Sequence, residues 1–220
     1  MNFLVQAFAW LTDPANHGGA GGIGARSLEH IAYTLIATGA AAVVGIPLGY
    51  WIGHTGRGRE LVVGATGAAR ALPTLGVLTL IALLTGVGVF APLVALSILA
   101  IPSILAGAYA GVEAIDPATV DAARAIGMSE WQVLGKVEIP LGLPQLLGGL
   151  RSATLQVVAT ATLVAYVGGG GLGRFLFLGL KTQDYPQMLA ASLLVVAIAV
   201  IGEVLFEIAV RTTHRRVRRA

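Results

Sequence analysis

The stretch from Val120 to Pro140 reads VDAARAIGMSEWQVLGKVEIP and is the most polar part of an otherwise apolar chain. Apolar runs that are too long for ordinary core helices lie on both sides of it. This alternation of apolar runs with a charged stretch decides the fold, because long apolar runs are stable in lipid and charged side chains are not. The stretch carries five charged residues, which are Asp121, Arg124, Glu130, Lys136 and Glu138.

The composition of the whole chain indicates an integral membrane protein. Of the 220 residues, 56% are hydrophobic and only 11% are charged, whereas a soluble domain carries about 25% charged residues. The chain has no cysteine, which excludes disulfides, thiolate metal sites and cysteine nucleophiles. Much of the net charge of +3 comes from the C-terminal RTTHRRVRR. Directly after an apolar run, such a tail indicates a cytoplasmic membrane flank rather than a nucleic-acid site.

Five apolar runs are long enough to cross about 30 Å of hydrocarbon at about 1.5 Å per residue. All must be helical, because lipid offers no partner to an unpaired backbone amide. The predicted fold class is therefore all-α, a polytopic membrane protein with five transmembrane helices. Pro73 falls inside the second run, where neighbouring helices or water must satisfy the freed backbone groups. The runs are 29–52, 61–84, 88–111, 141–167 and 188–210.

The arginines and lysines between the runs predict the orientation. Nine lie in one set of connections and three in the opposite set, and the positive-inside rule places the richer set in the cytoplasm. The N-terminus is then outside, and the C-terminus and the polar stretch are cytoplasmic. The nine are Arg57, Arg59, Arg124, Lys136, Arg211, Arg215, Arg216, Arg218 and Arg219, and the three are Arg26, Arg174 and Lys181.

These runs divide the chain into three parts. Residues 1–27 are predicted to be an external segment with a short interfacial helix at about 2–12, and they lack the basic n-region of a signal peptide. Residues 28–212 form the transmembrane domain, with a cytoplasmic loop at 112–140. Residues 213–220 are a basic cytoplasmic tail.

The first half of the loop is predicted to be a short capped helix. Asp116 is an N-cap residue, and Pro117 suits the first helical position. Gly127 provides the C-terminal stop. The helix therefore covers about 117–126, and Val120, Ala123 and Ile126 share one of its faces.

The second half is predicted to be another short helix. Ser129 and Gln132 have the spacing of a capping box. The helix is expected to run to about Val137, before Pro140 ends it. The weakly apolar faces and charged flanks of this pair of helices suit a groove on a soluble partner, and a capped connector that touches nothing is the alternative.

The spacing across this loop closely resembles the EAA loop of ABC importer permeases. That pattern is EAA, three residues, Gly, nine residues and I-x-L-P, and here Asp replaces Glu, Val replaces Ile and Ile replaces Leu. In that family the loop forms coupling helices that dock into a cleft on a cytoplasmic ATPase. The resemblance implies an ATPase-coupling role for Asp121, Ala122, Ala123, Gly127, Trp131, Val137, Ile139 and Pro140.

Across about 28–212 the chain resembles the methionine-importer-type permease fold, and its finer motifs resemble the osmoprotectant branch. That branch carries glycine betaine, carnitine, choline and proline-like solutes. The resemblance implies a cytoplasmic ATPase dimer, an external solute-binding protein on a separate chain, and a second permease subunit, identical or paralogous. The motifs are GIPLG at 45–49, RALPTL at 70–75, and VATATL at 158–163 followed by YVG at 166–168.

The run GGGGLG formally satisfies the dinucleotide pattern G-x-G-x-x-G, but it follows no predicted strand and lacks the βαβ context. No Walker A sequence occurs in the chain. We therefore expect no cofactor and no enzymatic activity, with ATP hydrolysed in another subunit. On the external side, the run is predicted to be a hinge or gate, with a plain flexible loop as the alternative. The residues concerned are Gly168, Gly170, Gly171 and Gly173.

Two arginines, Arg70 and Arg151, are placed deepest in the apolar runs. A charge within the membrane costs at least about 2.5–3.5 kcal/mol on insertion scales, so each needs water, a partner or a function. One interpretation is a polar translocation path; the alternative is a structural ion pair or a snorkelling side chain. Glu203 and Glu207 suit helix-face pairing near Arg211, with a proton relay as the alternative. The candidate path residues are Arg70, Thr74, Arg151, Thr154 and Gln156.

The resemblance thus implies a multi-pass permease of the bacterial cell membrane that carries a compatible solute. A methionine-type permease is one alternative, and an ATP-independent channel or proton-coupled carrier is another. The four histidines are scattered without metal-ligand spacing, so no metal site is expected. No aromatic cage for a betaine-like cation is apparent, because only 6% of the residues are aromatic and most lie near predicted span ends.

Overall fold

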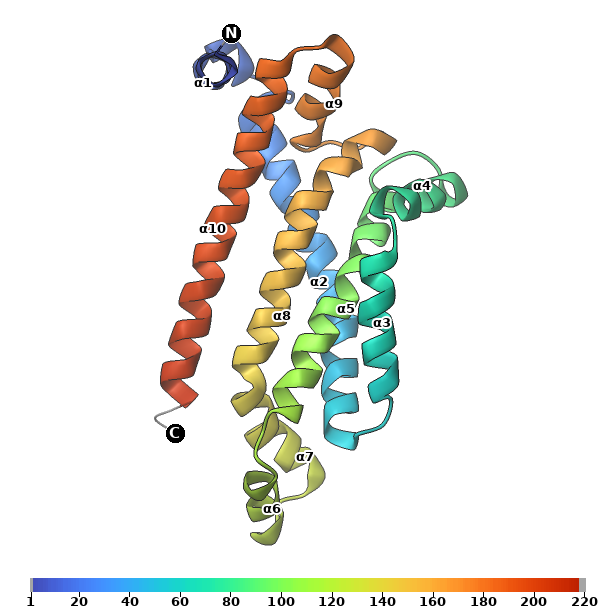
Figure 1. The fold of residues 1–220 in the computed structure, drawn as a ribbon, viewed down its shortest axis with the longest axis vertical. Helices are drawn as coiled ribbons and strands as arrows, with labels where there is room; N and C mark the ends of the chain where they lie inside the picture. The colour runs from blue at the N-terminus through green and yellow to red at the C-terminus, as the bar shows by residue number, and fades with distance from the viewer. Residues whose placement is uncertain (1, 218–220) are drawn as a thin grey trace. The chain divides into compact units, whose positions relative to one another are not determined.

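The computed structural model describes residues 2–217, and every regular element in that range is helical. Within it, the side chains of Leu61, Ala65, Ala69, Arg70 and residues 214–217 lie outside what is described. The elements in chain order, shown in Figure 1, are α1 (Phe3–Thr12), η1 (Pro14–Asn16), α2 (Ile23–Thr55), α3 (Arg59–Ala71), α4 (Thr74–Thr85), α5 (Phe90–Glu113), α6 (Pro117–Ala125), α7 (Glu130–Val133), η2 (Leu134–Glu138), α8 (Ile139–Thr160), η3 (Ala161–Val167), α9 (Gly173–Thr182) and α10 (Tyr185–Val217).

Four helical runs of the described chain are long and apolar enough to cross a membrane. They correspond to the first, third, fourth and fifth predicted runs. They are Ile23–Thr55, Phe90–Glu113, Glu130–Val167 and Tyr185–Thr213.

The second predicted run, 61–84, is not one helix. It is divided into α3 and α4, which contain 13 and 12 residues. The break falls at Leu72, whose ψ of 126° is extended, because the ring of Pro73 disfavours helical geometry in the preceding residue. The proline signal was thus visible in the sequence, whereas the complete break became apparent only in the structure.

The prediction that Pro140 ends the second loop helix is wrong. Helical structure continues from α7 through η2 into α8, and Pro140 is the second residue of α8. A proline inside a helix has no N–H to donate and crowds the carbonyl four residues earlier. Here the preceding turn, η2, is π-helical, so the hydrogen-bond spacing has already widened where the ring must fit.

The chain divides into two compact units, and each long helix contributes a part to both. One unit contains the chain up to Thr38 together with Pro73–Ser97 and Thr154–Gly202. The other contains Gly39–Leu72, Ile98–Ala153 and the chain from Glu203 onward.

In the first unit, α4, α5 and η3 bury a small apolar core, which consists of Leu78, Ala82, Ala91, Ala95 and Val167.

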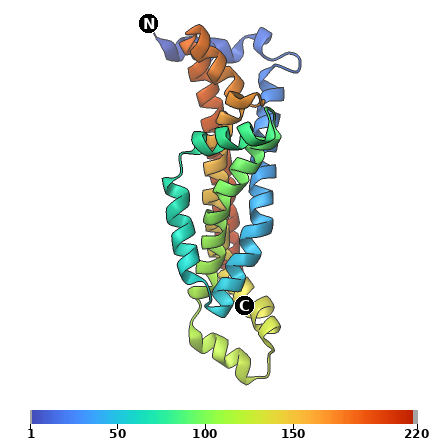
Figure 2. The same ribbon diagram turned by 90° about the vertical axis from the view of Figure 1, so that its right-hand side faces the viewer.

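Helix α1 packs against α9 and the start of α10. The rings of Trp10 and Phe175 meet edge-on with their centroids 5.1 Å apart, and the ring centroids of Phe3 and Tyr185 are 6.0 Å apart. Figures 1 and 2 show α1 lying across the end of α10 rather than along it. The predicted N-terminal helix is therefore confirmed as a helix.

In the second unit, glycines let α5 and α8 approach closely. A Cβ on Gly107 would lie 2.7 Å from Cα of Gly149, and one on Gly111 would lie 2.6 Å from the carbonyl oxygen of Gly142. Neither face has room for a methyl group, as expected of helices that associate in lipid through small residues. This packing fixes the start of α8, from which the polar loop extends at one end of the unit (Figure 1).

Candidate functional site

The first loop helix is built as its sequence predicts. The Asp116 carboxylate accepts a hydrogen bond from the N–H of Ala118 at 2.9 Å. The helix ends in a left-handed turn at Gly127, whose φ is +87°, and the N–H of Met128 returns to the carbonyl of Ala123 at 3.2 Å. A side chain with a Cβ is disfavoured at this φ, so Gly127 makes the corner between the two helices.

The second loop helix begins with the predicted capping box. The N–H of Ser129 donates to the side-chain oxygen of Gln132 at 2.9 Å, and the reciprocal contact is present. Val133 is fully buried in the following turn. Helix α7 continues through η2 into α8, so this short helix is joined without a break to a membrane-length helix.

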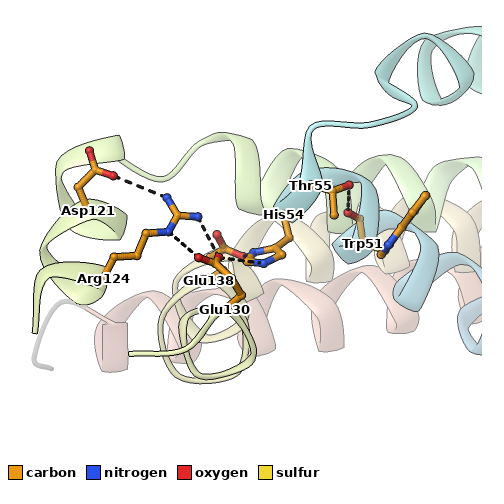
Figure 3. A network of polar contacts seen from close by, with 7 residues as sticks. All are labelled: Trp51, His54, Thr55, Asp121, Arg124, Glu130 and Glu138. Atoms are coloured by element: carbon orange, nitrogen blue, oxygen red, sulfur yellow. Dashed lines mark hydrogen bonds and ion pairs between the residues drawn. The ribbon is translucent and has the colours of Figure 1, made fainter. Parts of the chain in front are cut away.

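An ion pair joins the two sides of the corner (Figure 3). Arg124 on α6 donates from Nε and Nη2 to the two carboxylate oxygens of Glu130 on α7, both at 3.0 Å. Asp121 lies 3.6 Å from the same guanidinium. The hydrogen bonds to Glu130 raise the pKa of Arg124 above its ordinary value. The bidentate contact between Arg124 and Glu130 sets the orientation of α6 relative to α7. Its contribution to stability is small, because the pair is exposed to solvent.

A second polar contact ties the corner to the first long helix. The Nδ1–H of His54, near the end of α2, donates to Glu138 in η2 at 2.7 Å, and Nε2 lies 3.3 Å from Glu130 (Figure 3). The Glu138 side chain is only 4% exposed, and a buried carboxylate is costly without such a partner. His54 therefore satisfies Glu138 and holds the loop to α2.

This His54–Glu138 contact was missed in the sequence, because 84 positions separate the two residues. His54 was one of four scattered histidines, and Glu138 was one of five charges in the polar stretch. One sign was available. Glu138 stands at the start of an apolar run, where a carboxylate requires a partner.

The predicted coupling residues fall into two groups in the structure. Ala123 is buried, and Val137 and Ile139 are partly buried. These three support the loop from inside. The remaining five present an accessible surface, and they are Asp121, Ala122, Gly127, Trp131 and Pro140.

Arg151 has the ion-pair partners that the sequence left as an alternative. Its Nε donates to Glu203 at 2.7 Å, a second nitrogen contacts the other oxygen of that carboxylate, and Nη1 lies 3.0 Å from Glu207. Glu207 also accepts from Arg211 at 2.7 Å, four residues on. The network compensates every charge in it, which favours a structural role for Arg151.

The other candidate path residues lie on several elements and stay a prediction. Thr74 is the first residue of α4, and both Thr154 and Gln156 are partly buried on α8. The backbone of Arg70 belongs to α3, whereas its side chain lies outside the described residues.

The glycine-rich run is closely packed in the first unit. Gly171 donates its N–H to the Glu29 carboxylate at 2.8 Å, and Arg174 donates to the carbonyl of Gly169 at 2.7 Å. A Cβ on Gly170 would collide with Glu29, and one on Gly173 would collide with the backbone of Thr162. The run is therefore held by hydrogen bonds to the Glu29 and Arg174 side chains, in a space that leaves no room for a Cβ on Gly170 or Gly173.

His30 is a further residue that the sequence did not single out. It is fully buried, and its Nε2–H donates to the carbonyl of Val158 at 2.9 Å. A Cβ on Gly171 would lie 3.3 Å from its Nδ1, so His30 forms part of the wall behind the glycine run.

Helical runs of membrane-spanning length, joined by an exposed capped corner, define a multi-pass membrane protein. Residues 45–219 match the family model described as "Binding-protein-dependent transport system inner membrane component". The chain belongs to this family, which confirms the resemblance predicted from the loop. Membership implies a separate ATPase subunit and a substrate-binding protein as partners, and a location in the bacterial inner membrane.

Curated relatives cover most of the chain. It is 32% identical over 173 residues to the "Glycine betaine/carnitine/choline transport system permease protein OpuCB" of Bacillus subtilis (strain 168), covering 79% of this chain and 80% of the relative. It is 31% identical to the "Carnitine transport permease protein OpuCB" of Listeria monocytogenes, covering 89% and 90%. The "Osmoprotectant import permease protein OsmW" of Salmonella typhimurium is 30% identical, with 83% and 87% covered. The resemblance to osmoprotectant permeases is thereby confirmed.

Solved structures share the fold. The permease-fold chain in "Inward facing conformations of the MetNI methionine ABC transporter" superposes with a TM-score of 0.73 at 22% identity, covering 84% of this chain and 93% of that one. A chain of an "amino acid ABC transporter with histidines" gives a TM-score of 0.60 at 23% identity, with 86% and 94% covered. These identities support the architecture and leave the substrate to other arguments.

Proposed function

We propose that this chain is the permease subunit of an ABC importer for a compatible solute with a quaternary ammonium group, such as glycine betaine, choline or carnitine. The observation that carries the proposal is the match over 79–89% of the chain to relatives named for these solutes. The methionine transporter shares the fold at 22% identity, which is too distant to argue for methionine as cargo.

The exposed part of the corner is the proposed ATPase-docking surface. Asp121, Ala122 and Gly127 present small or acidic groups to solvent on and beside α6, which suits insertion into a groove of a soluble partner. Trp131 and Pro140 extend the surface, and the buried Ala123 and the partly buried Val137 and Ile139 support it.

Two routes would carry the movement of the ATPase into the membrane helices. The first is the continuous path α7–η2–α8, and the second is the contact of His54 with Glu138 and Glu130. Both start at the same corner, so ATP-driven displacement of α6 would move α2 and α8 together. A permease that alternates between two orientations needs such contacts to bias one state over the other.

The remaining parts of the assembly follow from the predicted topology. The N-terminus lies outside and the C-terminus in the cytoplasm. Helices α3 and α4 together make one broken crossing, in addition to the four continuous ones. A second permease subunit completes the path, for which Thr74, Thr154 and Gln156 are the candidate lining residues. The glycine run 168–173 lies at the external end and closes it.

Reconstitution tests the proposal. The chain is incorporated into vesicles with its ATPase and binding protein, and uptake of radiolabelled betaine, choline, carnitine and methionine is measured. ATP-dependent uptake of a quaternary ammonium solute supports the proposal, whereas uptake of methionine alone contradicts the assigned cargo. Uptake without ATP that collapses with an uncoupler would mean a proton-coupled carrier. The compensated network of Arg151, Arg211, Glu203 and Glu207 argues against that outcome.

A further inference from the structure

A cavity of about 690 Å³ opens beside the coupling corner, within the second unit. Its volume falls in the range of about 300–1,000 Å³ that is typical of small-molecule sites. One wall comes from the end of α2 and the other from α7, η2 and the start of α8. The lining residues used below are Tyr50, Trp51, His54, Glu130 and Trp131.

Three aromatic side chains line the cavity, alongside aliphatic ones such as Leu134 and Ile139. Trp51 and Trp131 are 80 positions apart in the chain, yet they line the same cavity, and Tyr50 joins them. The indole of Trp131 is 83% exposed and Trp51 is 53% exposed, so neither is a core residue. Tyr50 is buried, and its hydroxyl has no hydrogen-bond partner among the described residues. Exposed indoles that face a shared cavity offer π-surfaces to a ligand.

The polar end of the cavity is negatively charged. Glu130 lines it directly, whereas Glu138 and Asp121 do not line the cavity but belong to the same polar network as Glu130 (Figure 3). Three carboxylates and the single guanidinium of Arg124 leave a formal net charge of −2 when His54 is neutral, and −1 when it is an imidazolium. The electrostatic preference of this end is therefore for a cation.

Aromatic faces beside a carboxylate are the recognition chemistry of organic ammonium ions, which are held by cation–π attraction and weak desolvation. An anion would meet repulsion from Glu130, and a purely apolar molecule would leave the polar end unpaired. The cavity exceeds the size of one trimethylammonium group, so it also accommodates part of an attached chain.

We propose that this cavity is a binding site for an organic ammonium group, either a free quaternary ammonium solute or the ethanolamine head of a membrane lipid. A ligand between Trp51 and Trp131 would bridge α2 and α7 and so hold the coupling corner against the first long helix. The solute source rests on the proposed function, whereas the lipid source does not.

Tryptophan fluorescence provides a direct assay on the full-length chain. The protein has three tryptophans, and the third, Trp10, belongs to the other unit. Replacement Trp10→Phe therefore leaves only the two cavity indoles as reporters. Choline and glycine betaine are titrated against the purified chain, with 3,3-dimethylbutan-1-ol, the uncharged carbon isostere of choline, as control. We expect a saturable change with an ammonium ligand and none with the isostere.

Variants then test the walls. Trp131→Leu should weaken binding several-fold, because it removes the aromatic face on which a cation–π contact depends. Trp131→Phe should retain much of the affinity, and Glu130→Gln should lose several-fold. If Trp131→Leu binds as tightly as the parent, the ligand lies elsewhere and the site is wrong.

The lipid source is tested in bilayer nanodiscs made of phosphatidylglycerol with or without phosphatidylethanolamine. Native mass spectrometry should show ethanolamine lipid retained by the Trp10→Phe protein, lost in Trp131→Leu and displaced by excess choline if both sources share the cavity. Binding of either ammonium source alone supports the site. Binding of the isostere or of phosphatidylglycerol with equal affinity, or of none of these ligands, overturns it.

The result is independent of transport. Binding is measured on this chain alone, so an importer that carries no quaternary ammonium solute would refute the proposed cargo without removing the site. Conversely, ATP-driven betaine uptake with no ammonium binding at Trp51 and Trp131 would refute only the site.

Discussion

The coupling corner and the glycine-rich run are both irregular connections between helices that charged side chains help to hold, yet they differ in how much of each is exposed. The corner at 116–140 is held by caps and by charged side chains, and much of it is exposed. The run at 168–173 is held by backbone hydrogen bonds and by the side chains of Glu29 and Arg174, and Gly169 to Gly173 are buried. An exposed corner with its own internal support suits a partner that binds and releases. A buried run suits a segment that must fit its own protein.

The largest effect is expected at Gly173. Replacement Gly173→Ala places a Cβ against the backbone of Thr162, which cannot move as a flexible side chain would, and overpacking of this kind costs about 1–3 kcal/mol or more. We expect the melting temperature and the yield of folded protein to fall, with transport lost. Gly24→Ala is the matched control, since a Cβ there meets nothing within 4 Å. Equal stability of the two variants would mean that the run is not closely packed.

A smaller loss of stability but a specific loss of coupling is expected at Gly127. Replacement Gly127→Val forces a β-branched residue to a φ of +87°, which costs about 1–3 kcal/mol locally. Membrane insertion should survive, while co-purification of the ATPase and transport fall at least about tenfold. Gly135→Ala, which has open space around it, should behave like the parent. Normal transport by Gly127→Val would remove the docking role from this corner.

His54→Ala should have an intermediate effect. It leaves the buried Glu138 carboxylate without its partner, at a cost of about 1–3 kcal/mol. We expect ATP hydrolysis to continue with several-fold fewer solutes transported per ATP. Glu138→Gln alone should reduce the number of solutes transported per ATP by less, and the loss in the double variant should be smaller than the sum of the two single losses. Strict additivity of the two changes would show that the contact carries no coupling.

The smallest effect is expected from Arg124→Gln. The ion pair with Glu130 is exposed, and exposed pairs contribute little and are screened by salt. Uptake should change by less than about threefold, and the difference should shrink further between 50 mM and 500 mM NaCl. A larger loss that persists in high salt would mean that the two-pronged contact, rather than the caps, defines the corner.

The local chemistry of the loop was predictable because caps and corners depend on neighbours in the chain. Asp116, Gly127 and the box of Ser129 with Gln132 are all as their spacing indicates. The prediction for Pro140 is wrong because its effect depends on the helix geometry before it, which the spacing of the residues does not show. A proline signals a break only if the hydrogen-bond spacing before it stays α-helical, and the π-helical turn η2 relieves that conflict.

The sequence by itself determined the class of protein, the family and the corner, because hydrophobicity, charge deficit and capping are local properties that add up along the chain. Only the tertiary structure brought His54 to Glu138, Arg151 to Glu203 and Trp51 to Trp131. Each of these pairs is formed by helices that are distant in sequence. Which faces meet is decided by packing at small residues such as Gly107 and Gly149. An aromatic content of 6% thus gave no indication of a cage, and the fold placed two tryptophans around one cavity.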